Sequence, residues 1–483
     1  MPQPISVNQD LLAMEYAVRG PIAQRAAALR RQGKPVIPCH LGNPQALGQD
    51  PITFYRQVLG LLEEPARIAR ERRLNASPEA ARLLGAEDRY PEDVLERAAS
   101  MLANLRGGMG AYTESAGPLF IREAIARFID RRDTVGSGAA AAPPAAADPD
   151  RIYLTNGASE AARFLIEMLI GDRRDGLMIP TPQYPLYSAT IRKNGGTMVP
   201  YFPDEESGWT LSPERLEEAH RQAAADGVRV KGIVVINPAN PTGAVLDEAS
   251  VEGVVRFAER HGLVIIADEV YQENVYGDRF VSFARVVGPR DVPLFSLHST
   301  SKGFYGECGH RGGYLEARNP PRIEGTALNF CDLLLKEASV SLCSNTVGQA
   351  LTCLMVTPPE PGAPSHARFT AEREGILRGL YEKAGHIRRA FESMEGVRCF
   401  GRIGAMYLFP RLEVMPAGVT DFDYCMALLE ETGFCTVNGG GFGQKAGTQH
   451  LRIAFLPPMA TLDEALPRWI AFHNRFVRQP ARV

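Results

Sequence analysis

From residue 151 onward, short apolar runs alternate with segments of helical pattern, and this alternation constrains the fold more than any other feature of the chain. The runs are RIYL, GLMIP, TMVPYF, GIVVIN, GLVIIAD and PLFSL, at 151–154, 176–180, 197–202, 232–237, 262–268 and 293–297. Strands that alternate with helices predict a parallel sheet with helices on both faces. Uninterrupted apolar strands suit a sheet that is buried on both sides. We therefore expect an α/β fold built on a mostly parallel central sheet.

The segments outside this region predict how the chain is divided. Helical patterns dominate before it, and long helices with weaker strands follow it. A chain of 483 residues is long enough for more than one domain. We expect an N-terminal arm with part of a small domain at 1–60, a large domain at 61–335 and a small α+β domain at 336–483. Residues 134–150, rich in alanine and proline without an apolar face, predict an exposed, mobile loop in the large domain.

Composition and charge exclude several partners. A formal net charge of −3 and a pI near 6.4 give no electrostatic case for nucleic acid or an anionic membrane as partner. The eight cysteines contain no CxxC pair, so we expect neither a metal site nor a disulfide framework. No signal-peptide pattern and no run of about 18 apolar residues is present. A cytoplasmic protein is the resulting expectation.

Polar residues gather where the predicted strands end. The segments that follow the apolar runs are TNGAS, TPQYP, NPANPTG, DEVY and HSTSK, at 155–159, 181–185, 237–243, 268–271 and 298–302. Ligands of open parallel sheets bind beyond the carboxyl ends of the strands, so these segments should meet in one site. They offer free N–H groups, an aromatic ring, an amide, a carboxylate with a phenol, and a lysine. A cofactor with a phosphate, an aromatic ring and a carbonyl would use all of these groups, and pyridoxal phosphate fits.

Two of these strand ends have candidates for the phosphate and for the ring nitrogen. Gly157, Ala158 and Ser159 open a predicted helix, whose free N–H groups suit a phosphate. Without a ligand, Ser159 would be an ordinary helix cap. Asp268 ends a wholly apolar strand, where a carboxylate needs a partner. A pyridinium nitrogen is such a partner, although a cap for the following segment explains Asp268 equally well.

Three further residues suit the cofactor ring. Tyr271 and Asn240 could both reach the phenolate oxygen beside the aldehyde, and Tyr184 could stack on the ring face. Asn240 lies in a proline-rich turn, where it could equally be a turn residue. Tyr184 lies between prolines, where packing alone is a common explanation.

Lys302 is the candidate for the residue that forms a Schiff base with the carbonyl. Burial at a strand end and a nearby cation favour the uncharged amine that such chemistry needs. Ser299 and Arg311 flank Lys302 and could hold the phosphate, the arginine through its fork of donors. Ser299 and Lys302 also form an S-x-x-K pattern, but the SDN and KTG motifs of that chemistry are absent, and Gly303 discourages a helix.

The motifs taken together resemble a known family. NPANPTG, ADEVYQENVY, SLHSTSKGFYGECGHRGGY, IPTPQYPLYSAT, SNTVGQAL and GAMYLFPR are similar to the alanine aminotransferases, which are class I pyridoxal-phosphate aminotransferases of fold type I. The likeness runs in order from YAVRGPI at residue 16 to residue 458, nearly the whole chain. It implies a fold type I enzyme with a smaller α+β domain, pyridoxal 5′-phosphate as cofactor and a homodimer.

The resemblance also implies a role for each candidate. Lys302 would hold the cofactor and move the proton, with Asp268 and Tyr271 as further catalytic residues. The implied cofactor-binding residues are Tyr112 of the neighbouring subunit, Gly157, Ala158, Ser159, Tyr184, Asn240, Asp268, Tyr271, Ser299, Lys302 and Arg311. The implied substrate-binding residues are Gly42, Tyr184, Asn240 and Arg452, with Arg452 on the α-carboxylate.

The reaction that the resemblance implies is transfer of the amino group of L-alanine to 2-oxoglutarate by a ping-pong mechanism. Alternatives are an aminotransferase of the same branch that uses glyoxylate or another small pair, a lyase on the same fold, and a protein that only binds a ligand. The chain departs from the family pattern at Ala239, where glycine is usual, and in VNGGGFGQ at 437–444, where VPGSGFGQ is usual. The second departure lies just before the Arg452 strand and could affect substrate choice.

Overall fold

The computed structural model describes residues 5–12, 14, 20–85, 89–134, 145–277 and 279–478. Residues 135–144, most of the segment expected to be a mobile loop, lie outside the described residues, so that expectation stays a prediction. Among the helices of the described part, none is long and apolar enough to cross a membrane.

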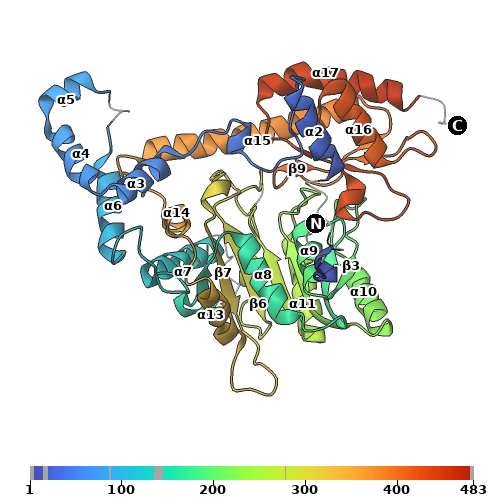
Figure 1. Cartoon of the computed structure of the whole chain (residues 1–483), viewed down its shortest axis with the longest axis horizontal. Helices are drawn as coiled ribbons and strands as arrows, with labels where there is room; N and C mark the ends of the chain where they lie inside the picture. The colour runs from blue at the N-terminus through green and yellow to red at the C-terminus, as the bar shows by residue number, and fades with distance from the viewer. Residues whose placement is uncertain are drawn as a thin grey trace.

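A central sheet runs through the larger part of the molecule (Figure 1). Within the described residues it has seven strands in the order β1-β7-β6-β5-β4-β2-β3. The strands are β1 (Ile152–Leu154), β2 (Asp175–Pro180), β3 (Thr197–Tyr201), β4 (Arg229–Ile236), β5 (Val264–Asp268), β6 (Leu294–Ser299) and β7 (Gly313–Arg318). Only β7 runs antiparallel to its neighbours, β1 and β6, and the other neighbouring strands pair in parallel. The prediction of a mostly parallel sheet is therefore confirmed, and β1 to β6 correspond to the six apolar runs.

β7 is the strand that the apolar pattern did not predict. Its sequence, GYLEAR, contains Glu316 and Arg318, whose side chains are both buried and pair with each other at 2.7 Å. A charged pair at alternate positions hides the strand from a search for apolar runs. The ion pair makes burial possible because each charge meets a partner of opposite sign.

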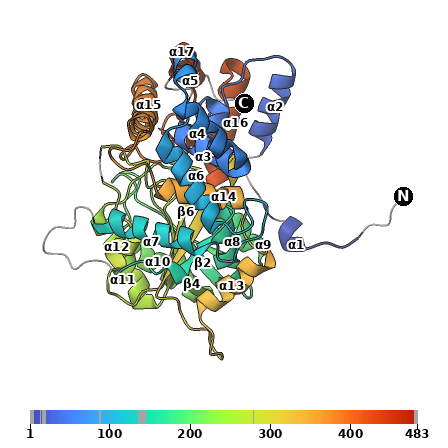
Figure 2. The same ribbon diagram turned by 90° about the vertical axis from the view of Figure 1, so that its left-hand side faces the viewer.

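Helices cover both faces of the sheet, and Figure 2 shows them on either side of β2, β4 and β6. One face is covered by α8 (Ala158–Leu169), α9 (Pro185–Lys193) and α13 (Phe330–Val340), and the other by α10 (Pro213–Ala225), α11 (Glu248–His261) and α12 (Phe283–Val287). Successive side chains of a strand point to opposite faces. In β2, Leu177 and Ile179 pack on the first face and Met178 on the second, which explains the uninterrupted apolar run.

A third group of helices packs beside the sheet and extends away from it in Figure 1. These helices are α3 (Thr53–Glu63), α4 (Ala66–Ala76), α5 (Pro78–Leu83), α6 (Glu92–Asn104), α7 (Leu119–Thr134) and α14 (Thr346–Val356). Apolar residues of α3, α6, α7 and α14 share one core with β1. A short helix, α1 (Gln9–Leu12), lies near α9 and pairs through Asp10 with Arg173 and Arg192.

A smaller α+β unit joins the two ends of the chain. Its helices are α2 (Pro21–Arg31), α15 (His366–Glu392), α16 (Asp421–Thr432) and α17 (Met459–Phe476). Its strands are β8 (Val397–Arg398), β9 (Tyr407–Leu408), β10 (Arg411–Leu412), β11 (Val437–Asn438) and β12 (Leu451–Ala454), paired in the orders β10-β8 and β11-β12-β9.

The N-terminal segment enters this unit through backbone pairing. α16 begins with a capping box between Thr420 and Asp423 and ends at Gly433, whose φ of 82° lets the chain turn into Phe434. Phe434 pairs in parallel with Ile37, and the Cys39 carbonyl accepts a hydrogen bond from the Ala454 N–H at 2.7 Å. Residues 37–42 therefore run beside β12, the strand that carries Arg452.

Replacing Trp469 should test how far this unit depends on its core. Trp469 is 1% exposed, packs edge-on against Phe391 and at a tilt against Phe434, and donates to the Tyr424 hydroxyl at 2.9 Å. We expect Trp469→Ala to lower the free energy of unfolding by about 3–5 kcal/mol, because it leaves a cavity. Urea unfolding followed by circular dichroism measures this. The half-exposed neighbour Arg468 is the control: Arg468→Ala should change stability by less than about 0.5 kcal/mol, and equal losses would contradict the expectation.

Candidate active site

The N-terminus of α8 and Arg311 form a cradle for an anion. Gly157 precedes α8 with a φ of 76°, and the Arg311 guanidinium donates to the Asn156 carbonyl at 2.8 Å and to Ser159 Oγ at 2.9 Å. A Cβ at Gly157 would lie 2.6 Å from Arg311 Nη2, so glycine is required both by the backbone and by this close approach. Free helix N–H groups beside an exposed guanidinium suit a phosphate.

Lys302 lines the same cavity as this anion cradle. β6 ends at Ser299, whose Oγ accepts from the Ser301 N–H at 3.3 Å, and the chain then turns without forming a helix. Lys302 Nζ donates to the Gly42 carbonyl at 2.7 Å. The amine is therefore held between the sheet and the N-terminal segment that runs beside β12.

Asp268 ends β5 and is buried, with 5% of its surface exposed. Burial raises the pKa of this carboxyl to about 6, against the effects of a hydrogen bond from Tyr187 Oη at 2.7 Å and of the Lys302 charge. No helix follows Asp268, so it caps none, although its Oδ1 accepts from the Val270 N–H of the following turn at 3.4 Å. An ionised Asp268 calls for a cation or a strong donor beside it, as a protonated ring nitrogen would be.

Tyr271 and Tyr407, which line the same cavity as Asp268, form a hydrogen bond with each other. Tyr271 Oη donates to Tyr407 Oη at 3.2 Å. Burial raises the pKa of Tyr271 well above its ordinary value. Burial also acts to raise the pKa of Tyr407, but the charges of Lys302 and Arg452 outweigh it and lower that pKa. The two shifts agree with Tyr271 as the donor of this hydrogen bond.

Arg452 on β12 is a fully buried cation, 1% exposed. It donates through Nη1 to Asn240 Oδ1 at 3.0 Å and through Nη2 to the His40 carbonyl at 2.7 Å. Its guanidinium lies 4.3 Å from the ring centre of Tyr407 and 4.8 Å from that of Phe442. Among the described residues it makes no ion pair with a carboxylate. A buried guanidinium that lacks an anionic partner is suited to bind a carboxylate from a ligand.

These groups surround one cavity of about 320 Å³. Of the residues predicted from the sequence, it brings together Gly42, Ala158, Ser159, Tyr184, Asn240, Asp268, Tyr271, Ser299, Lys302, Arg311 and Arg452. Gly157 contributes behind the cradle through its contact with Arg311. Tyr112 does not line the cavity; it is 77% exposed and lies in a separate surface hollow.

Several residues of the site were not predicted. Tyr187 follows Tyr184 by three positions in PQYPLYSAT, a helical spacing that places both on one side of α9, and this signal could have identified it. Tyr407 stands in GAMYLFPR, and the sequence gives no local reason for it to face Tyr271. Phe442 and Cys308 also lie at the site, Phe442 against Arg452 and Cys308 with its thiol 3.1 Å from the Ser301 carbonyl.

Comparison with known protein families identifies the family of the chain that forms this cavity. The family model for aminotransferase class I and II matches residues 82–468. The chain belongs to the class I and II aminotransferases. The resemblance found in the motifs is thereby confirmed.

Relatives match this aminotransferase over almost its whole length. Alanine aminotransferase 2 of Panicum miliaceum is 40% identical over 98% of this chain and 98% of its own, and alanine aminotransferase 1 of Bos taurus is 42% identical over 98% and 95%. Glutamate–glyoxylate aminotransferase 2 of Arabidopsis thaliana is 39% identical over 99% and 96%. The solved structure of an alanine aminotransferase from Pyrococcus furiosus is 25% identical, with a TM-score of 0.76 over 97% of this chain and 100% of that one.

The aminotransferase is a pyridoxal-phosphate enzyme of fold type I. Its cavity fits that cofactor on geometric grounds. The cradle of Gly157 and Arg311 suits the phosphate, and the buried Asp268 suits a protonated ring nitrogen. Lys302 lies between them in the same cavity. Within the described residues, no group of three or more histidine, cysteine, aspartate or glutamate side chains is placed to hold a metal ion.

Gly42 and Tyr407 should be tightly coupled. A Cβ at Gly42 would overlap the Tyr407 hydroxyl and lie 3.1 Å from its Cζ. We expect Gly42→Ala to displace the ring and raise KM for the amino acid roughly tenfold, a loss typical of one disturbed contact. Adding Tyr407→Phe should restore part of the loss, because the overlapping oxygen is removed. Steady-state kinetics of the two single variants and the double variant measure the coupling, and strictly additive losses would contradict it.

Replacing Asp268 should stabilise the cofactor-free protein at alkaline pH. The pKa of Asp268 is raised in the folded state, so ionisation disfavours folding above that pKa and has no effect at pH values where the carboxyl is protonated in both states. We expect Asp268→Asn to raise the free energy of unfolding by about 1–3 kcal/mol near pH 8 and to change it little near pH 4. Thermal unfolding at both pH values measures this. Asp50→Asn, at an exposed site, is the control, and a gain that did not depend on pH would contradict the expectation.

Proposed function

We propose that this aminotransferase moves the amino group of L-alanine to 2-oxoglutarate, giving pyruvate and L-glutamate. The observation that carries the proposal is Arg452, a buried guanidinium that has no acidic partner among the described residues and lines the same cavity as Lys302. Every amino acid and 2-oxo acid brings a carboxylate that such a fork can bind. The names of the Panicum and Bos relatives support alanine as the donor.

The names of other relatives favour a second candidate. Two Arabidopsis relatives are named glutamate–glyoxylate aminotransferases, so a glutamate–glyoxylate exchange is the alternative. The partners of both exchanges bring a carboxylate that Arg452 could bind. Tyr407 and Gly42 lie against each other beside Lys302, and Tyr407 also packs on Arg452, so these residues would line the space beside the bound carboxylate.

In this proposal, each residue of the cavity has its own role. Bound pyridoxal phosphate supplies an aldehyde that takes up the amino group and a ring that accepts the electrons of the Cα–H bond. Arg452 binds and orients the substrate carboxylate, and Lys302 Nζ removes the proton from the substrate Cα and returns it to the product side. Asp268, held by Tyr187, keeps the ring nitrogen protonated. Tyr271 and Asn240, which both line the cavity, hold the ring oxygen.

The phosphate and the ring face have their own residues in this proposal. Ala158, Ser159, Ser299 and Arg311 hold the phosphate, with Gly157 giving room for the arginine. Tyr184, the N-cap residue of α9, stacks on the ring of the cofactor. Once the substrate fills the cavity, Gly42 and the segment before it exclude water from Lys302.

We also propose a homodimer in which Tyr112 of one subunit completes the phosphate site of the other. Tyr112 is 77% exposed in the single chain, an unusual position for a tyrosine without a partner surface. The division into 1–60, 61–335 and 336–483 stays a prediction. So does a cytoplasmic location, since relatives from Dictyostelium, Arabidopsis and yeast carry mitochondrial in their names.

A panel of amino donors against 2-oxoglutarate and glyoxylate tests the substrate. We expect L-alanine with 2-oxoglutarate to give the highest kcat/KM, in keeping with the names of the Panicum and Bos relatives. Pyruvate should appear once per enzyme when no 2-oxo acid is added, followed by no further turnover. Lys302→Ala is the control, and should lose the cofactor's visible band and at least about 10³-fold in kcat, since it removes the proton carrier. Continuous release of pyruvate and ammonia without an acceptor would instead identify a lyase.

A further inference from the structure

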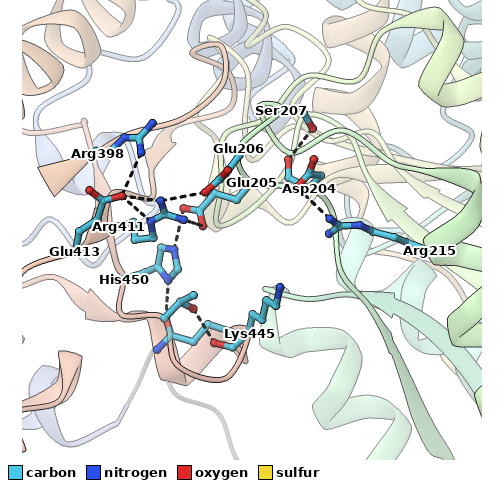
Figure 3. A network of polar contacts seen from close by, with 12 residues as sticks. Asp204, Glu205, Glu206, Ser207, Arg215, Arg398, Arg411, Glu413, Lys445 and His450 are labelled. Atoms are coloured by element: carbon cyan, nitrogen blue, oxygen red, sulfur yellow. Dashed lines mark hydrogen bonds and ion pairs between the residues drawn. The ribbon is translucent and has the colours of Figure 1, made fainter. Parts of the chain in front are cut away.

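His450 lies two residues before Arg452 and has a polar partner at each ring nitrogen. It is 2% exposed, and its ring stacks on Phe409 with centres 4.8 Å apart. Nδ1 lies 2.7 Å from Gln444 Oε1, and Nε2 lies 2.9 Å from Glu205 Oε1. Figure 3 shows His450 and Arg411 reaching the acidic side chains of the loop that follows β3. This contact joins the central-sheet part of the molecule to the smaller unit.

The orientation of the Gln444 amide is fixed by Asp421. Gln444 Nε2 donates to Asp421 Oδ2 at 2.6 Å, and the same carboxylate oxygen accepts from the Gly440 N–H at 2.8 Å. Asp421 Oδ1 faces the Asn438 amide at 3.5 Å. A carboxylate surrounded by N–H donors only accepts, so turning the Gln444 amide over would set oxygen against oxygen. The Gln444 oxygen must therefore face His450.

Both nitrogens of His450 then face acceptors. Gln444 Oε1 accepts from Nδ1, and the Glu205 carboxylate accepts from Nε2. A neutral imidazole carries only one N–H, so it could make only one of these two hydrogen bonds. The geometry is satisfied by an imidazolium with a proton on each nitrogen.

The charges around the ring agree with this assignment. Glu205 also pairs with Arg411 at 3.2 Å, and Arg411 pairs with Glu206 and Glu413. Arg398 completes the network by pairing with Glu413. With His450 charged, the cations Arg398, Arg411 and His450 match the anions Glu205, Glu206 and Glu413. The other groups packed on the ring, Phe409 and Trp209, carry no charge.

Gln444 connects this network to the residues that pack against Arg452. Gln444 and Asp421 hold the 3-10 turn Gly439–Phe442, and the Phe442 ring lies 4.8 Å from the Arg452 guanidinium. The Phe442 carbonyl accepts from the Gln183 N–H at 2.8 Å, beside Tyr184. The Gly439 N–H donates to the His450 carbonyl at 2.8 Å, so the turn begins against the backbone of the residue that carries the ring.

We propose that His450 is a positioning residue of this aminotransferase: as an imidazolium between Glu205 and Gln444, it fixes the turn that holds Phe442 against Arg452. The inference rests on the proposed role of Arg452 in binding the substrate carboxylate. Losing the ring proton gives up one of the two hydrogen bonds and loosens the turn. Binding of substrate carboxylates then weakens, while the chemistry at Lys302 is unchanged.

The kinetic test compares two variants of the network with a matched control in the holoenzyme. We expect His450→Gln to raise KM for both the amino acid and the 2-oxo acid roughly tenfold while kcat stays within about twofold, the pattern of a lost binding contribution. Glu205→Gln keeps an oxygen for Nε2 and should give a smaller rise. His261→Gln removes a similar pair, His261 with Glu217 at 2.8 Å between α10 and α11, and should leave both constants unchanged. An unchanged KM in both network variants would overturn the proposal.

A second measurement reads the ring directly. In holoenzyme labelled with ¹⁵N-histidine, the His450 signals are those that are absent from the His450→Gln variant. If His450→Gln does not fold, they are identified as the histidine signals that shift in Glu205→Gln. We expect a proton on both nitrogens in the wild type, and a changed Nε2 signal in Glu205→Gln, because that nitrogen then loses its charged acceptor. A single protonated nitrogen in the wild type overturns the inference. Arg452→Lys separates the two proposals: if it leaves KM unchanged, the role of Arg452 fails, whatever the state of His450.

Discussion

The site depends on a buried guanidinium that has no acidic partner in the part of the chain that the structure describes. Taking a cation out of water is costly unless hydrogen bonds and aromatic faces replace the lost hydration. Arg452 finds these in the Asn240 amide, the His40 carbonyl and the rings of Tyr407 and Phe442. These partners come from four distant parts of the chain. The fold has to bring all four together. The Arg452 guanidinium still has N–H donors available for the anion of a ligand.

The other end of the cavity solves the opposite problem, a buried anion. Asp268 is held by Tyr187 and by the charge of Lys302, yet burial still dominates its pKa. One cavity thus contains a cation short of an anion and an anion short of a cation. An amino acid bound next to a protonated heteroaromatic ring would satisfy both at once. This pairing of unmet charges explains why the enzyme binds two small molecules in so little space.

The sequence predicted the frame of this site better than its details. Continuous apolar strands buried on both faces are recognisable from local pattern, and the polar residues at their ends follow from the geometry of parallel sheets. Asp268 and Lys302 were found in this way, and Arg311 by its place nine residues after Lys302. Tyr407 was not found, because its partner Tyr271 lies 136 positions away along the chain. Tyr187 was missed although it follows Tyr184 at helical spacing, and its partner Asp268 lies 81 positions away. β7 escaped because Glu316 and Arg318 are buried as a pair, which no single residue reveals.

The pairing of the two chain ends has a consequence for how the protein is made. Arg452 binds the carbonyl of His40, 412 positions earlier, and Phe434 completes a backbone bridge with Ile37. Contacts this far apart in sequence form late, because most of the chain must be ordered before they bring any gain. On a ribosome the first segment would leave the tunnel long before its partners are translated. The central sheet can form early, but the substrate pocket closes only when synthesis is nearly finished, so truncated chains would carry the cofactor residues without the carboxylate site.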